Sequence, residues 1–137
     1  MKRNKEKKRF DYELELVDEE INRSERFDLN FCVLAVELSH LNPRGLSRIL
    51  PGDVISFHIV NKYIRNYDRI FGPYFRRYFI ILPQTDTRGA DVVKQRIQEI
   101  ALKYQWGNVS IGVAIFPDNG KKAVELLNTA VDKISNP

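Results

Sequence analysis

The stretch RIFGPYFRRYFIILPQTD, residues 69–86, has the pattern of a β-hairpin that leads into a buried strand. Five residues with aromatic or guanidinium side chains meet at its bend: Tyr74, Phe75, Arg76, Arg77 and Tyr78. They can form a binding surface, but a solvated turn flanked by cross-strand aromatic pairs has the same residue pattern. The rest of the chain is needed to weigh these interpretations.

The apolar pattern on both sides of the hairpin predicts the other elements. An uninterrupted apolar run at 31–38 indicates a strand that is covered on both faces, and 109–116 is predicted to be another strand. Helical spacing of apolar residues predicts four helices, over 10–24, 53–67, 87–104 and 121–134. The order helix, strand, helix, hairpin, helix, strand, helix predicts an α+β fold, one sheet with helices packed across it.

The length and composition limit the class of protein. A chain of 137 residues suits one domain with a single core, and no apolar run is long enough to cross a bilayer. The basic start has no apolar stretch behind it, so we expect neither a secretory signal nor membrane insertion. The single Cys32 excludes an internal disulfide, which favours a cytoplasmic protein.

The positive charge is concentrated at the N-terminus. Residues 1–10 hold six Lys or Arg and one Glu, whereas the whole chain has a net charge of only +4. The other 127 residues are therefore close to neutral, and we do not expect a nucleic-acid partner. We predict a basic, flexible tail over 1–9 and one folded domain over 10–137.

Three segments resemble a known family in both spacing and sequence. They are Asp68 to Pro83 followed by Thr85-Asp86, the run NVSIGVAIFPDNG (108–120), and ELLNTA (125–130). They resemble the second half of a GGDEF domain, the diguanylate cyclase family. Members typically read D-x-x-x-R-Y-G-G-D-E-F-x-x-x-L-P, and Asp68 and Leu82-Pro83 stand at the matching distances. The resemblance implies a nucleotide-cyclase fold with a ferredoxin-like central sheet flanked by helices.

In the same alignment register, this chain differs from the family at every position of the signature. Where the family has Gly-Gly-Asp-Glu-Phe, this chain has the five residues of the bend, Tyr74 to Tyr78. In the family the acids help to hold magnesium, whereas a guanidinium cannot ligate a cation or accept a proton. Glycine lets the backbone approach a nucleotide closely, and Tyr74 and Phe75 would fill that space. We therefore expect a degenerate GGDEF domain that is not an enzyme and has no cofactor.

Two further positions depart from the family. The strand acid that resembles the first metal ligand is Glu37, a vestigial metal position, and the second aspartate of that strand is replaced by Ser39. In this register the family's inhibitory R-x-x-D motif falls on Ile70 and Pro73. The resemblance thus implies that both nucleotide sites are lost, and we expect no metal site.

These residues predict a regulatory or protein-interaction module that keeps the cyclase fold as a scaffold. It either acts in cyclic di-GMP signalling or shares only the architecture of those proteins. The expected partner is another protein, of the GGDEF type or a sensor. The predicted surface is the bend of the hairpin with Arg65 and Arg69 at its edge. The alternative is a metal-independent receptor that binds GTP or cyclic di-GMP through Arg76 and Arg77. An active nucleotide cyclase is a more distant alternative. In the fold that the resemblance implies, the strand end at Glu37 lies opposite the hairpin, so Arg76 or Arg77 is predicted to pair with Glu37.

Overall fold

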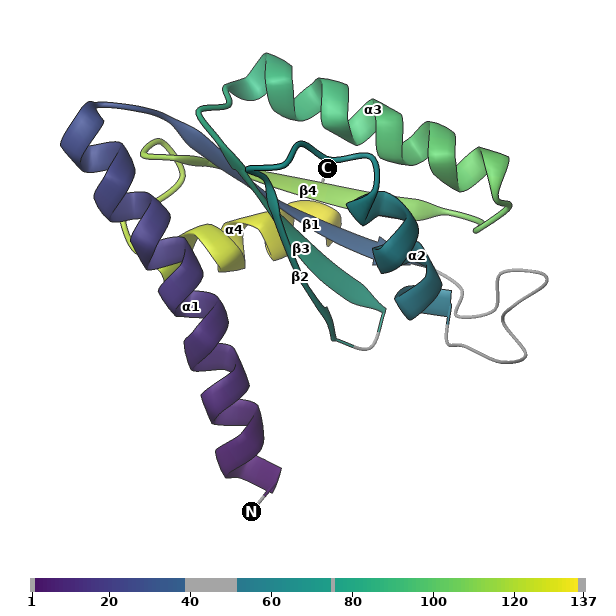
Figure 1. Ribbon diagram of the computed structural model, residues 1–137, viewed down its shortest axis with the longest axis horizontal. Coiled ribbons are helices and arrows are strands. Elements are labelled where there is room, and N and C mark those ends of the chain that lie inside the picture. The colour runs from purple at the N-terminus through teal and green to yellow at the C-terminus, as the bar shows by residue number, and fades with distance from the viewer. Residues whose placement is uncertain (1, 39–51, 75, 136–137) are drawn as a thin grey trace.

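The computed structural model describes residues 2–38, 52–74 and 76–135. Its helices are α1 (Lys2–Phe27), α2 (Gly52–Asn61), α3 (Thr87–Lys103) and α4 (Ala123–Ser135). Its strands are β1 (Phe31–Leu38), β2 (Arg69–Tyr74), β3 (Arg77–Pro83) and β4 (Val109–Phe116). The strands form one antiparallel sheet in the order β2-β3-β1-β4. The predicted α+β fold, with one sheet flanked by helices, is confirmed (Figure 1).

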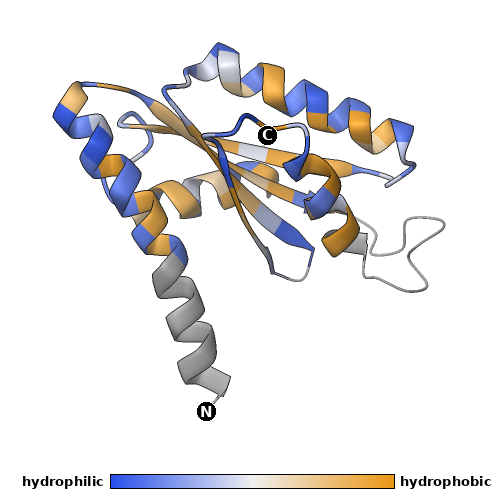
Figure 2. Ribbon diagram, viewed as in Figure 1, coloured by the Kyte–Doolittle hydropathy of each residue, from blue (hydrophilic) through white to orange (hydrophobic). Residues whose placement is uncertain are grey.

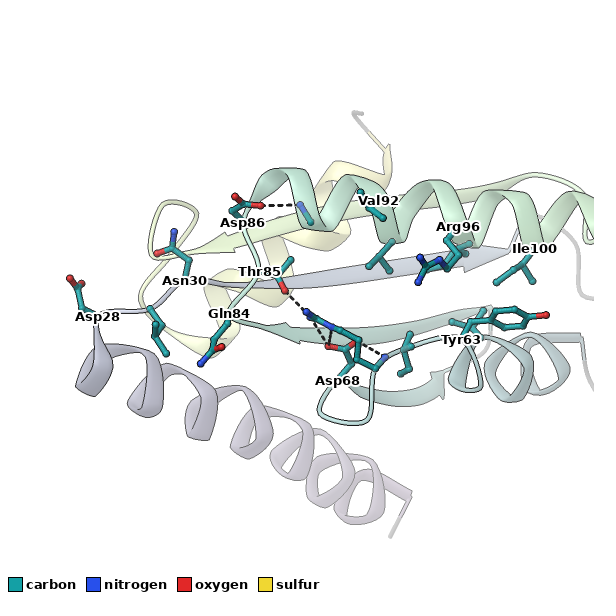
Figure 3. A pocket seen from close by; sticks show the side chains of 17 residues that line it. Asp28, Asn30, Tyr63, Asp68, Gln84, Thr85, Asp86, Val92, Arg96 and Ile100 are labelled. Atoms are coloured by element: carbon teal, nitrogen blue, oxygen red, sulfur yellow. Dashed lines mark hydrogen bonds and ion pairs between the residues drawn. The ribbon is translucent and has the colours of Figure 1, made fainter.

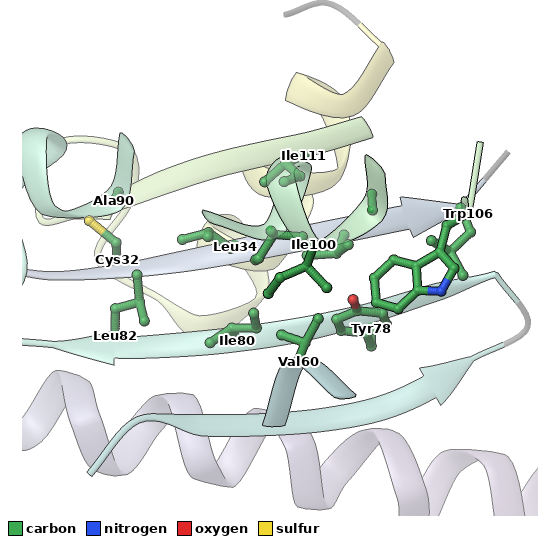
Figure 4. Close-up of a cluster of buried hydrophobic side chains, with 14 residues drawn as sticks. Cys32, Leu34, Val60, Tyr78, Ile80, Leu82, Ala90, Ile100, Trp106 and Ile111 are labelled. Carbon is green, nitrogen blue, oxygen red and sulfur yellow. The ribbon is translucent and has the colours of Figure 1, made fainter. Parts of the chain in front are cut away.

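Helices cover both faces of the sheet, which explains the uninterrupted apolar run of β1. Alternate β1 side chains enter two separate cores: Leu34 and Val36 pack on the α2 and α3 face, and Val33 and Ala35 pack on the α4 face. Figure 2 shows the resulting apolar colouring along the central strands. Figure 4 shows the first core, where Cys32 lies beneath Ala90 of α3.

The packing of α4 on β4 is unusually close. A Cβ atom added to Gly112 would lie 1.9 Å from the carbonyl oxygen of Ala130, so any larger residue would push the helix away. The glycine of the SIGVA run therefore has a packing role in this chain. The Asp86 carboxylate accepts a hydrogen bond from Gly89 N at 2.9 Å, which confirms the predicted cap of α3.

Two helix ends differ from their predicted positions by more than three residues. The first helix begins at Lys2 instead of residue 10, because the Lys, Arg and Glu of the basic segment have good helix propensity. The flexibility of residues 1–9 stays a prediction. The second helix ends at Asn61 instead of Tyr67, because the Asp68 carboxylate accepts the Arg65 backbone N–H at 2.8 Å and closes a turn. That turn leads the chain directly into β2.

Candidate functional site

The hairpin formed by β2 and β3 carries the residues at the signature positions. Tyr74 and Arg77 face each other across its end, next to an irregularity in the β2 pairing between Phe71 and Tyr74. Phe75, which belongs to the predicted surface, lies outside the described residues. The Arg76 backbone carbonyl accepts a hydrogen bond from Leu38 N at 2.9 Å. This contact ties the bend to the end of β1.

Arg77 pairs with Glu37, as the sequence predicts. The two residues are register partners on adjacent antiparallel strands, and Arg77 Nη2 donates to Glu37 Oε1 at 2.9 Å. Both side chains are about one-third exposed, at 34% and 35%. The contact uses one guanidinium nitrogen, and Arg77 Nε is buried without a hydrogen-bond partner. The resemblance makes Glu37 a vestigial metal position. Its carboxylate is bonded instead to the cationic side chain of Arg77.

Metal ligands are scarce around this end of the sheet. Within residues 2–38, 52–74 and 76–135, no group of three His, Cys, Asp or Glu side chains is placed to hold an ion. Glu37 is acidic, but its register partners are Arg77 on β3 and Ser110 on β4. The described part of the site therefore offers a divalent cation one carboxylate, already bonded to a guanidinium.

Tyr78 does not belong to a surface. Its side chain is fully buried, its hydroxyl is 2.8 Å from Ser56 Oγ, and its ring meets the ring of Phe57 edge to face. Burial raises the pKa of the Tyr78 hydroxyl. Placing Tyr78 in the predicted interaction surface is therefore wrong, because strand alternation turns this side chain toward α2. Tyr74 and Arg76 are both partly exposed and remain in that surface.

Arg65 and Arg69 lie at the opposite end of the hairpin from Arg77. Arg69 is the register partner of Ile81, and Arg65 Nη2 is 3.3 Å from the Pro83 carbonyl oxygen. The six residue steps from Arg77 to Pro83 correspond to about 20 Å of strand. The prediction that Arg65 and Arg69 form the edge of the bend surface is wrong, because closeness in sequence across a hairpin arm does not bring its ends together.

The Arg65 guanidinium is held in place by several groups. Its Nε and Nη2 donate to the Asp68 carboxylate at 2.8–3.0 Å, and Nη2 also lies 2.8 Å from Thr85 Oγ1. The Tyr67 ring lies under the guanidinium carbon, 4.4 Å from it. The bonds to Asp68 raise the pKa of Arg65 above its ordinary value. These contacts fix the guanidinium in a single orientation.

Arg65 lines a pocket of about 620 Å³ between α3 and the segment that joins α2 to β2. Figure 3 shows Arg96 reaching into it from α3, with Thr85 and Asp68 on the side of the sheet. Among the residues that the structure describes, Arg96 has no hydrogen-bond or ion-pair partner. Apolar side chains also line the pocket: Val60, Ile64, Val93, Ile97 and Ile100.

Sequence reasoning missed this pocket, although one signal was present. Residues Arg65 to Asp68 read R-x-x-D, five positions before the place where the family register puts that motif. The structure joins its two ends as an ion pair. The participation of Thr85 and Arg96, 20 and 31 positions further along the chain, has no local signature.

Comparisons with known proteins show which solved structures have a similar fold. No protein-family model and no curated protein matches the sequence. Several solved GGDEF domains match the structure. The GGDEF domain of TpbB (YfiN) from Pseudomonas aeruginosa is 14% identical, with 88% of this chain and 77% of that chain covered and a TM-score of 0.71. The diguanylate cyclase SiaD of the same organism, solved with its activator SiaC, is 18% identical, with coverages of 90% and 52% and a TM-score of 0.74.

A third neighbour is a microbial GGDEF domain solved in an interaction with cyclic di-GMP. It is 14% identical, with 86% of this chain and 78% of that chain covered and a TM-score of 0.68. The chain therefore has the fold of GGDEF domains, as its sequence predicts. No helix among the described residues is both long and apolar enough to cross a membrane.

Proposed function

We propose that this chain is a catalytically inactive, GGDEF-like regulatory module of cyclic di-GMP signalling. The observation that carries the proposal is the Arg77–Glu37 ion pair at the position of the signature. Phosphoryl transfer to form a cyclic dinucleotide relies on metal ions that bridge phosphates and neutralise developing charge. A guanidinium bonded to Glu37 competes with such an ion for this carboxylate and repels it, which supports inactivity.

The test is incubation of the purified chain with GTP and Mg²⁺ or Mn²⁺, with an active GGDEF cyclase as the positive control. We expect no cyclic di-GMP from this chain by mass-resolved chromatography. Turnover that disappears in Glu37→Ala would overturn the proposal, because it would assign a catalytic role to this carboxylate.

The regulatory role requires a partner, and the bend of the hairpin is its proposed binding surface. Tyr74, Arg76 and the Arg77–Glu37 pair are partly exposed there, and Arg and Tyr are enriched at the energetic centres of interfaces. The complex of the structural neighbour SiaD with an activator protein supports a protein as the partner. A pull-down with Arg76→Ala, compared with the unchanged chain, tests this surface.

The Arg65 pocket favours a second function, a metal-independent receptor for cyclic di-GMP. Such a ligand has two phosphates and two guanine bases, and a guanidinium can donate a hydrogen bond to a phosphate and stack on a base. Arg65 is fixed in orientation, and Arg96 lies on the opposite wall of a pocket lined by apolar side chains. The R-x-x-D pattern and the neighbour solved with cyclic di-GMP support the same assignment.

Calorimetry without divalent metal tests the receptor. We expect cyclic di-GMP to bind, GTP and GDP to bind more weakly, and added salt to reduce affinity because charges are screened over ~10 Å at 0.1 M. Arg65→Ala or Arg96→Ala should abolish binding, whereas Lys133→Ala, an exposed residue of α4, should not alter it. Binding that is lost only in the Arg76→Ala, Arg77→Ala double variant would move the site back to the bend. No binding of any nucleotide would refute the receptor.

A further inference from the structure

The two edge strands of the sheet differ in how well they are protected from pairing with another strand. β2 is interrupted by an irregularity between Phe71 and Tyr74, contains Pro73, and begins with the charged Arg69. Bulges, prolines and charges are the features that keep an edge strand from recruiting a further strand. β4 has the sequence VSIGVAIF and pairs with β1 through eight consecutive residues without a bulge. It has no charge and no proline.

The hydrogen bonds at the end of β4 show which backbone groups point away from β1. Ile115 N donates to Asn119 Oδ1 at 2.9 Å, and Ile115 O accepts from Asn119 N at 2.7 Å. Because these groups alternate along a strand, the N–H and C=O of Val109, Ile111 and Val113 also point outward. Among the described residues, none of these three outward pairs of groups has a partner.

We propose that β4 pairs with β4 of a second copy of this chain, antiparallel and around a twofold axis through Ile111. This register sets Ile111 opposite Ile111 of the second copy and Val109 opposite Val113. It provides about six backbone hydrogen bonds, two for each opposed pair of residues. It also leaves the two hydrogen bonds between Ile115 and Asn119 intact. Other registers either engage Ile115 or leave one of the three outward residues unpaired.

The side chains of β4 are compatible with this register. On the α3 face, the opposed residues are β-branched and apolar, a combination that stabilises cross-strand pairs. On the α4 face, Ser110 meets Gly112 of the second copy, so no bulky groups collide there. No charged residue of β4 meets a like charge, because the strand has none. A twofold axis normal to the sheet also keeps the helices of both copies on matching faces.

The experiment is sedimentation velocity of the full chain over a wide concentration range. We expect a reversible species of twice the 16.0 kDa chain mass. Ser110→Lys, an exposed position where lysine blocks an edge, should raise the dissociation constant roughly tenfold or more, whereas Ser110→Thr should leave it unchanged. Val113→Pro, which removes one outward N–H, should weaken the dimer as well, with circular dichroism as the check on folding.

Hydrogen exchange by NMR locates the contact. The amides of Val109, Ile111 and Val113 should be protected in the unchanged chain and exchange quickly in Ser110→Lys, while the Gly112 amide, bonded to β1, stays protected in both. A chain that remains monomeric at the highest concentration would overturn the proposal. So would a dimer that persists in both Ser110→Lys and Val113→Pro.

Discussion

Two arginine–carboxylate pairs lie at opposite ends of the same hairpin, and they differ in nearly every physical respect. Arg77 and Glu37 share one hydrogen bond, and both side chains are about one-third exposed. Asp68, by contrast, is 1% exposed at its side chain and accepts bonds from the Arg65 backbone and guanidinium. The first pair joins two strands that already pair, and the second closes the turn between α2 and β2.

The difference shows that the charge of a pair says little about its structural role. An exposed pair with one hydrogen bond contributes little to stability because water and salt compete for both groups. A buried carboxylate with several donors is costly to remove because its donors lose their acceptor. We therefore expect the end with Arg77 to tolerate substitution and the end with Arg65 to depend on its pair.

Asp68→Ala should give the largest change. The backbone N–H and guanidinium of Arg65 lose their acceptor, and we expect about 2 kcal/mol less free energy of unfolding. Urea denaturation measures the change, and Asp132→Ala, an exposed acid of α4, is the matched control. Equal stability of the two variants would contradict the structural role of the Arg65–Asp68 pair.

Tyr78→Phe should cost about 1 kcal/mol, although the residue lies near the tolerant end of the hairpin. The substitution removes the hydroxyl that lies 2.8 Å from Ser56 Oγ and leaves a buried serine without its partner. Adding Ser56→Ala to Tyr78→Phe should cost less than the sum of the two single changes, as a double-mutant cycle in urea would show. Strict additivity would mean that the hydroxyls do not interact.

Arg77→Ala and Glu37→Gln should each change the free energy of unfolding by less than ~1 kcal/mol. Added salt should reduce the difference from the unchanged chain, because the pair is partly exposed. Thermal unfolding at low and high salt measures this effect. A loss as large as that of Asp68→Ala would remove the distinction between the two ends.

Deletion of residues 2–9, which include neither ion pair, should give the smallest change. We expect the melting temperature to stay nearly the same. The sequence of this segment, KRNKEKKR, has no apolar face to bury, so its removal should cost little stability. Calorimetry of the two chains gives the comparison. A fall of many degrees would show that the basic segment docks on the domain.

Local pattern was enough to predict most of the fold. The uninterrupted run of β1, the strand pattern of β4, the hairpin and the helical stripe of α3 are all local patterns, set by residues close together in the sequence. The pairing of Glu37 with Arg77 was predictable as well, because strand register brings distant residues together once the fold is known. The sequence by itself thus determined the elements and the sheet.

Only the tertiary structure decided which arginines share a site. Arg65 and Arg69 lie near the bend in sequence but about one strand length from it in space. Arg65 instead lines the same pocket as Arg96, which comes from a helix beyond β3. The structure also shows that Tyr78 is buried and not part of the surface, because α2 covers that side of β3. A one-dimensional pattern records which side chains are polar or aromatic, whereas the packing of helices on a sheet decides which of them face one another.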